Sequence, residues 1–187
     1  MYHLLTTLLL TNFGALHDEI MTMHDADQLL RTEWIQEKKE EIATEILVLD
    51  IIHQERLSEI IEKEGWLGAD RIGEEGAHAL WLLVQHSPDV EFQTRCLPLL
   101  QQAAEKGQAL LKDYAFLQDR VLVRRGEAQI YGTQTAIVEG RVVFFPIQDE
   151  EDVEVRRFEV GLNTLWEQAV ETTKRYQVRT ESGQNSQ

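Results

Sequence analysis

His86 and Asp119 are the two residues of this sequence whose types and positions best suit acid–base chemistry. His86 ends the stretch 74–86, whose apolar residues surround the helix axis and predict a buried helix. Asp119 interrupts an apolar row of the helix predicted over 108–122. Each needs a partner, because burying an unpaired polar group costs about 1–3 kcal/mol. We predict that Asp119 orients the His86 ring for general acid or base work, with a purely structural hydrogen bond as the alternative.

The segment 126–147 carries an unusual number of hydrogen-bonding side chains for a strand. Side chains alternate between the faces of a strand, so Gln129, Tyr131 and Thr133 should share one face and Gln134 the other. Gly132, which has no side chain, allows a backbone or a ligand to come close. We expect this strand to supply partners to the buried polar side chains of the helices.

Arginines supply the predicted contacts to an anionic ligand. Arg120 follows Asp119 directly, and a guanidinium can hold a carboxylate or a phosphate through two parallel hydrogen bonds. Of Arg156 and Arg157, Arg157 is the better candidate, because Gly161 one turn later leaves room for an approaching group. Gln85 shares a face of the buried helix with His78 and completes the polar set.

A metal site and a cofactor are not expected. His78 and His86 are eight residues apart, so they point about 80° from one another, unlike the i, i+4 histidine pair of a helical zinc site. The single cysteine, Cys96, cannot form an internal disulfide bond and lies in a helical run that is typical of packing.

The formal charge of −15 makes this an acidic protein and disfavours nucleic acids and anionic membrane surfaces as partners. A basic protein is the partner that such a surface would attract. The apolar segment 1–14 lacks a basic start and is too short to cross a bilayer, which takes about 20 apolar residues. We expect a cytoplasmic protein. The alternative is a secreted or periplasmic one, cleaved after Gly14 or Ala15.

The pattern of apolar residues predicts a mainly α fold in one domain, residues 15–178, followed by a disordered tail, residues 179–187. About six helices are expected, over 15–32, 33–64, 74–86, 87–106, 108–122 and 149–176. Ser87 is the predicted N-cap of the fourth helix. A single β-hairpin should cover about 128–147, with its turn at Glu139 and Gly140.

Several short strings occur in the order found in a mostly bacterial family, the domain of unknown function 6624, which this sequence resembles from Asp27-Gln28 to Trp166. They are Gly-Trp at 65–66, Val-Gln-His at 84–86, Asp-Arg-Val at 119–121, Gln-Ile-Tyr-Gly-Thr-Gln at 129–134, Phe-Pro-Ile at 145–147 and Arg-Arg-Phe-Glu-Val-Gly-Leu at 156–162. The sequence departs from the family at Leu67, where proline is frequent, and at His53, where asparagine is common. The resemblance carries over no activity.

The resemblance implies that His86, Asp119 and Arg120 form one site with Gln129, Tyr131 and Gln134. Two classes of function follow. The first is a small-molecule enzyme of hydrolase or lyase type that binds a polar or anionic substrate. The second is a non-catalytic binding, immunity or accessory protein that uses its acidic surface. A pocket lined by these residues favours the enzyme, and a solid polar core favours the binder.

Overall fold

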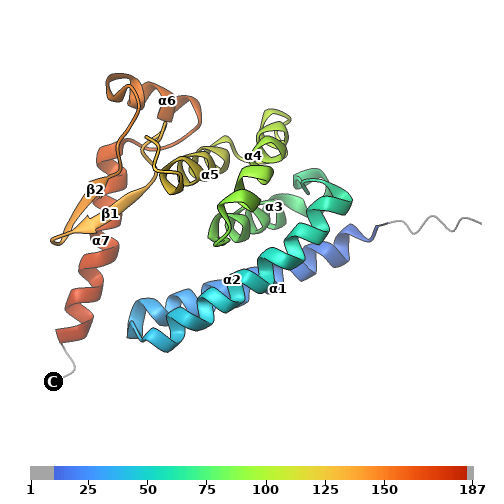
Figure 1. The fold of residues 1–187 in the computed structure, drawn as a ribbon, viewed down its shortest axis with the longest axis horizontal. Helices are drawn as coiled ribbons and strands as arrows, with labels where there is room; N and C mark the ends of the chain where they lie inside the picture. The colour runs from blue at the N-terminus through green and yellow to red at the C-terminus, as the bar shows by residue number, and fades with distance from the viewer. Residues whose placement is uncertain (1–10, 185–187) are drawn as a thin grey trace, which may run out of the picture.

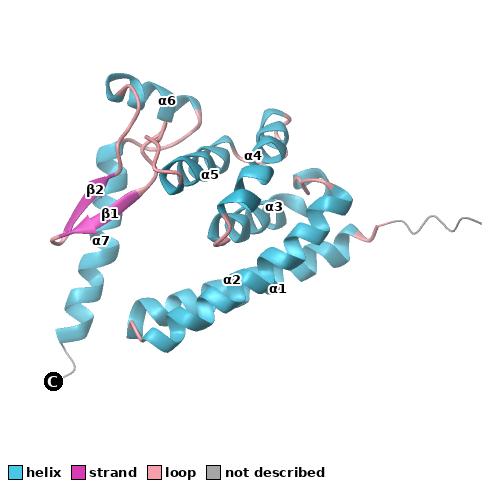
Figure 2. Ribbon diagram, viewed as in Figure 1, coloured by secondary structure: helices cyan, strands magenta, loops and turns pink. Residues whose placement is uncertain are grey.

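The computed structural model describes residues 11–184, with side chains up to residue 174, and shows a mainly α fold with one hairpin, as predicted (Figures 1 and 2). The helices in this range are α1 (Phe13–Glu37), α2 (Glu40–Glu64), α3 (Ala69–His86), α4 (Val90–Glu105), α5 (Leu111–Arg124), α6 (Val153–Glu159) and α7 (Leu165–Gln184), with a 3-10 turn at Glu150–Asp152. The strands are β1 (Thr135–Val138) and β2 (Arg141–Phe144). The predicted segment 1–14 lies mostly outside the described residues.

Helix α3 lies at the centre of the helical body. The long helices α1 and α2 run side by side and both contact α3, while α4 and α5 pack together and also contact it (Figure 1). The hairpin and α7 lie together at one end of this body, where α7 packs against β2. Residues of α1 and α5 line one cavity together with residues of the hairpin and α7, so parts of these two helices lie near this end.

The prediction that residues 74–86 form a buried helix is confirmed. Leu80 and Val84 have no exposed surface, and most other residues of the last three turns are buried, with His78, Leu82 and His86 as the exceptions. Gly73 has a positive φ of 71° and separates these turns from the first turn of α3. Cys96 of α4 is also buried, and burial raises the pKa of its thiol to about 12, in keeping with the packing role predicted for it.

Several helix boundaries differ from those predicted, most clearly the end of α1 and the start of α4. Helix α1 runs on to Glu37 and ends where Lys38 adopts a left-handed conformation and donates its N–H to Trp34 O. The N-cap of α4 is Asp89, whose carboxylate accepts from Glu91 N at 2.8 Å, and not Ser87. Ser87 instead donates to the Gln54 side chain of α2 at 2.7 Å, so it ties α2 to the end of α3.

The helix predicted over 149–176 is interrupted. Gly161 has a φ of +75°, and its N–H donates to Phe158 O, which ends α6 before α7 begins at Leu165. On either side of this break, Phe158 of α6 is 84% exposed and Trp166 of α7 is 66% exposed. Helix α7 then continues to Gln184, over most of the segment 179–187 for which a disordered tail is expected.

The hairpin is shorter than predicted. Its strands pair from Thr135 opposite Phe144 to Val138 opposite Arg141, and Glu139 and Gly140 form the turn with φ angles of 51° and 73°. Residues 129–134 lie before the strands and form a loop, joined to the chain after β2 by an isolated bridge between Gln129 and Ile147. Within residues 11–184, no helix is long and apolar enough to span a bilayer.

Candidate functional site

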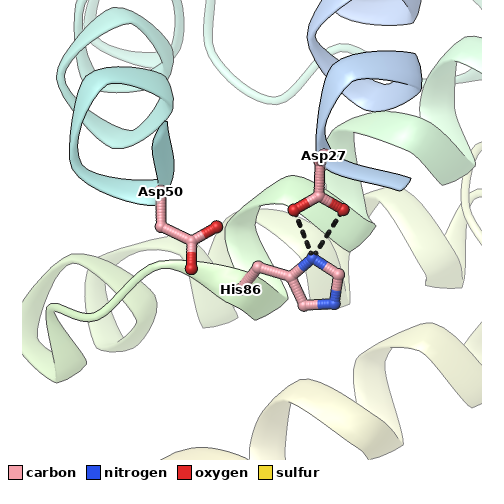
Figure 3. A group of neighbouring side chains, drawn as sticks. All are labelled: Asp27, Asp50 and His86. Carbon is pink, nitrogen blue, oxygen red and sulfur yellow. Dashed lines mark hydrogen bonds and ion pairs between the residues drawn. The ribbon is translucent and has the colours of Figure 1, made fainter. Parts of the chain in front are cut away.

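His86 forms a hydrogen-bonded pair with Asp27 of α1. The Nδ1 atom of His86 lies 3.0 and 3.1 Å from the two carboxylate oxygens of Asp27 (Figure 3). The Asp27 side chain is 1% exposed and that of His86 is 18% exposed, so the carboxylate is buried and the ring reaches solvent. The Nε2 atom of His86 points away from Asp27 and makes no hydrogen bond to any residue that the structure describes.

Arg31 and Gln28 hold the Asp27 carboxylate from its own helix. Arg31 Nε donates to it at 2.7 Å, across one helical turn, and Gln28 Nε2 donates at 2.8 Å. Burial by itself would raise the pKa of Asp27, but the hydrogen bond and charge of His86 and the charge of Arg31 outweigh burial and lower this pKa to about 2. Asp27 is therefore ionised at neutral pH.

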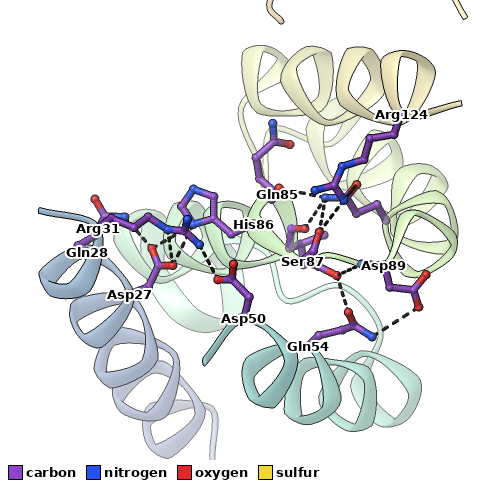
Figure 4. Close-up of polar contacts among 12 residues, drawn as sticks. Asp27, Gln28, Arg31, Asp50, Gln54, Gln85, His86, Ser87, Asp89 and Arg124 are labelled. Carbon is purple, nitrogen blue, oxygen red and sulfur yellow. Dashed lines mark hydrogen bonds and ion pairs between the residues drawn. The ribbon is translucent and has the colours of Figure 1, made fainter. Parts of the chain in front are cut away.

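Asp50 of α2 brings a second buried carboxylate to the pair. Arg31 Nη2 donates to it, so one guanidinium bridges the carboxylates of α1 and α2 (Figure 4). Burial raises the pKa of Asp50, and the charge of Arg31 opposes this effect. His53, one turn along α2, is buried with an Nδ1 atom that has no hydrogen-bond partner, and burial lowers its pKa.

Asp27, Asp50 and His86 could together hold a metal ion, because they offer three ligand atoms within 4.8 Å of one another. Carboxylate and imidazole are ordinary ligands of first-row divalent metals. However, Arg31 already bonds both carboxylates and supplies a positive charge between them. A metal ion would have to displace this guanidinium.

The end of α3 that carries His86 is fastened by a second polar group, shown beside the first in Figure 4. Arg124 of α5 donates to Ser87 O at 2.7 Å and to Gln93 Oε1 at 3.1 Å. The buried Gln93 amide donates in turn to Val84 O and Gln85 O, both at 3.0 Å. These side chains donate to carbonyls at the end of α3, where backbone partners run out, and Val84 O accepts from Ser87 N at 3.2 Å as well, so the backbone around His86 is held in place.

Arg120 lies one turn before Arg124 on the same face of α5 and contacts Gln85 of α3. With the amide oxygen of Gln85 turned toward α5, this oxygen accepts from Arg120 Nε at 2.6 Å and from Nη2 at 3.3 Å. Burial, then the positive charges of Arg124 and Arg31, lower the pKa of Arg120 to about 10. No carboxylate within the described part of the chain forms an ion pair with Arg120.

Asp119 does not meet His86, contrary to the expected pairing. Its carboxylate has no exposed surface and accepts from the backbone N–H groups of Ile130 at 2.7 Å, Tyr131 at 3.1 Å and Thr133 at 2.9 Å. The Thr133 hydroxyl donates to it as well, at 2.9 Å. The buried acid finds its donors in the loop 129–134 because this loop leaves α5 and turns back over it.

Arg157 and Gln129 also fasten this loop. The fully buried guanidinium of Arg157 donates to Asn163 O, Tyr131 O and Gly132 O and to the side chains of Asn163 and Gln168. These five bonds occupy all five of its N–H groups, so none is left for a ligand. The buried Gln129 amide donates to Gln134 O at 3.0 Å and to Phe145 O at 2.9 Å. Both residues shape the loop.

A cavity of about 400 Å³ lies between the loop 129–134 and Arg31 of α1. Its walls come from α1, α5, the loop, the hairpin and α7, and are formed by Arg31, Trp34, Ile35, Phe116, Thr133, Thr135, Ile137, Gln168, Glu171 and Thr172. Arg31 links the cavity to the Asp27–His86 pair. Of the candidate residues predicted from the sequence, Thr133 lines this cavity. Tyr131 and Gln134, which are close to Thr133 in the sequence, are half-buried and do not line it.

A second histidine–aspartate pair lies near the middle of α3, about two turns before His86. His78 Nδ1 is 3.0 Å from the buried carboxylate of Asp113 of α5, and the His78 side chain is 46% exposed. The His78 ring packs against Trp81, with 4.9 Å between the ring centroids. A smaller cavity of about 170 Å³ touches both residues of the pair. This pair provides an internal comparison for the first.

The sequence interpretation missed Asp27, Arg31, Asp50 and His53. These residues lie on α1 and α2, whose many acids are typical of solvent-facing helix surfaces. Two signals could have found the first two: the i, i+4 spacing of Asp27 and Arg31, and the position of Asp27-Gln28 at the start of the family resemblance.

The fold and the site define a mainly helical protein with a buried carboxylate–histidine pair where α1, α2, α3 and α5 meet. The chain belongs to a family of unknown function, DUF6624, whose sequence model matches residues 14–179. No curated protein and no solved structure matches it.

Proposed function

We propose that the protein is a small-molecule enzyme of hydrolase or lyase type, in which His86 is the general base or acid and Asp27 orients its ring. The observation that carries this proposal is the bond from His86 Nδ1 to a buried carboxylate, with Nε2 left for a substrate. This is the base–orienter geometry of acid–base catalysis. Asp27 takes the role that the sequence suggested for Asp119.

The electrostatics of the pair support this assignment. Asp27, with a pKa of about 2, is a carboxylate at neutral pH and can accept only. The neutral ring of His86 must then carry its proton on Nδ1 and a lone pair on Nε2. A lone pair on the nitrogen that points away from Asp27 is what a general base requires.

A cavity is connected to the pair through Arg31, which bonds Asp27 and lines the cavity, although neither Asp27 nor His86 is among its lining residues. The cavity of about 400 Å³ that Arg31 borders is of the size that holds small metabolites. Its wall alternates apolar groups with the hydroxyls of Thr133 and Thr135. Tyr131 and Gln134 belong to the same fastened loop, and we retain them as candidate substrate contacts. Arg120 is the remaining candidate.

A second candidate function, a non-catalytic binding, immunity or accessory protein, is favoured by one surface. Residues 149–152 form an exposed run of four acids ahead of α6, in a chain of formal charge −15. Such a run would attract a basic protein partner.

Nitrogen-15 NMR of the histidine rings tests the proposed enzyme directly. We expect neutral His86 to be the Nδ1–H tautomer in the native protein and to move toward the Nε2–H tautomer in Asp27→Asn, because the amide can donate to Nδ1. Asp113→Asn is the matched control, since it removes the carboxylate of His78 and should leave His86 unchanged. An Nε2–H tautomer of His86 in the native protein contradicts the proposal.

Activity gives the second measurement. A panel of chromogenic esters, amides and phosphoesters should reveal a turnover that falls by about 100-fold or more in His86→Gln. His78→Gln removes the comparison histidine and should retain this turnover. Equal activities of the native protein and His86→Gln would refute the role proposed for His86. They would favour the second candidate function, a binding protein that uses its acidic surface.

A further inference from the structure

We propose that Arg120 binds an oxyanion, a carboxylate or a phosphate, on the molecule that His86 acts on. This inference rests on the proposed function, because it names the class of its substrate. It rests on a comparison of the hydrogen-bond partners of three arginines, Arg31, Arg120 and Arg124, which lie where α1, α3 and α5 meet.

Two of these arginines, Arg31 and Arg124, form hydrogen bonds that stabilise the fold and explain why they are there. Arg31 bonds the carboxylates of Asp27 and Asp50 and so joins α1 to α2. Arg124 bonds Ser87 O and Gln93 Oε1 and so fastens the end of α3. Neither guanidinium needs a ligand to explain its position.

Arg120 differs from both. Its only partner within the described residues is the Gln85 amide oxygen, which engages Nε and Nη2. A guanidinium has five N–H groups, so both donors of Nη1 and one of Nη2 remain. These donors point from neighbouring nitrogens in one plane, which is the arrangement that receives two oxygens of a carboxylate or phosphate.

The charges around Arg120 lead to the same conclusion. The chain has 33 acidic residues, yet none of those described is paired with Arg120, while the charges of Arg31 and Arg124 repel it. Burial and this repulsion disfavour the charged form of the Arg120 guanidinium and therefore lower its pKa. A bound anion would offset both effects. Groups that a fold keeps at a cost to its own stability are found mainly at functional sites.

The position of Arg120 connects the anion to the proposed chemistry. Gln85, which it contacts, precedes His86, and Phe116, one turn earlier on α5, lines the cavity of about 400 Å³ together with Arg31. An anion on Arg120 would therefore sit at the junction that also holds the cavity and the Asp27–His86 pair. It would anchor one end of a substrate while another part reaches Nε2.

Titration of the full chain with inorganic phosphate and, separately, acetate tests the inference. We expect saturable binding, observed by calorimetry and by the side-chain NMR signal of Arg120, and a loss of affinity of about tenfold or more in Arg120→Gln. The anion that binds more tightly identifies the substrate group. Arg125→Gln is the matched control, because Arg125 is the exposed C-cap residue of α5 and pairs with Glu91 at the surface.

Unchanged affinity in a folded Arg120→Gln protein, or no saturable binding of either anion to the native protein, overturns the inference. Arg120→Lys provides a further variant. It keeps the positive charge but cannot donate two parallel hydrogen bonds to one anion, so it should bind with intermediate affinity. The anion site and the catalytic proposal fail separately. His86→Gln should bind the anions as the native protein does, and a wrong His86 tautomer would refute the chemistry without affecting the anion affinity.

Discussion

Replacing Asp119 by asparagine should lower the free energy of unfolding by about 3–5 kcal/mol. The two oxygens of Asp119 accept different donors: Oδ1 accepts from Ile130 N at 2.7 Å, and Oδ2 accepts from Thr133 N at 2.9 Å. An asparagine has one oxygen, so in either orientation its NH₂ group would face a backbone N–H. At least two hydrogen bonds to a charge are lost or weakened, each worth about 1.5–3 kcal/mol, in a site without exposed surface.

Urea unfolding followed by circular dichroism measures this loss. Asp113→Asn is the comparison, because Asp113 is also buried but, among the side chains that the structure describes, bonds only the half-exposed His78, so this variant should lose less stability. A loss below about 1 kcal/mol in Asp119→Asn would show that the carboxylate does not hold the loop. The His86 tautomer should be the same in Asp119→Asn as in the native protein, since His86 pairs with Asp27.

Two further variants probe the pair and the loop. The pKa of Asp27 is lowered from 3.8 to about 2 in the fold, so Asp27 should contribute about 2 kcal/mol of stability that is present above pH ~4 and is lost as the pH falls toward ~2. Asp27→Asn should flatten the stability profile over this window, and an unchanged profile would exclude this contribution. Gly132→Ala should destabilise the protein by about 1–3 kcal/mol, because φ is +68° and the new Cβ would lie 2.6 Å from Leu165 Cδ2. Gly140→Ala, where φ is +73° but no atom lies within 4 Å, isolates the backbone cost, and equal losses in the two glycine variants would rule out the clash.

The buried helix was the most predictable part of the fold. Other helices cover α3 on several sides, so apolar residues surround its axis. This burial is visible in the local pattern of apolar residues in the sequence. The break at Gly161 was harder to foresee, since a glycine within a periodic stretch is compatible with a continuous helix. Here the positive φ of Gly161 and the bonds of the buried Arg157 end α6.

The pattern identified buried polar residues better than it identified their partners. Asp119 is buried, as predicted, and His86 is only partly buried, with its side chain 18% exposed; each bonds a segment that the pattern does not select. His86 meets Asp27, which lies 59 residues earlier in the chain. Asp119 meets backbone N–H groups, which any residue other than proline can provide and which leave no trace in the sequence.

The fastening of the loop 129–134 has a consequence for comparing members of this family. Asp119 holds backbone N–H groups of the loop and Arg157 holds its carbonyls, so these contacts preserve a shape. The Asp27–His86 pair lies on other elements and can be lost without disturbing that shape. Under the proposed function, evolution could uncouple the two, leaving descendants that keep the Tyr-Gly-Thr-Gln string as inactive pseudoenzymes. The string would then trace ancestry within the family, and the Asp27–His86 pair would mark the members expected to be active.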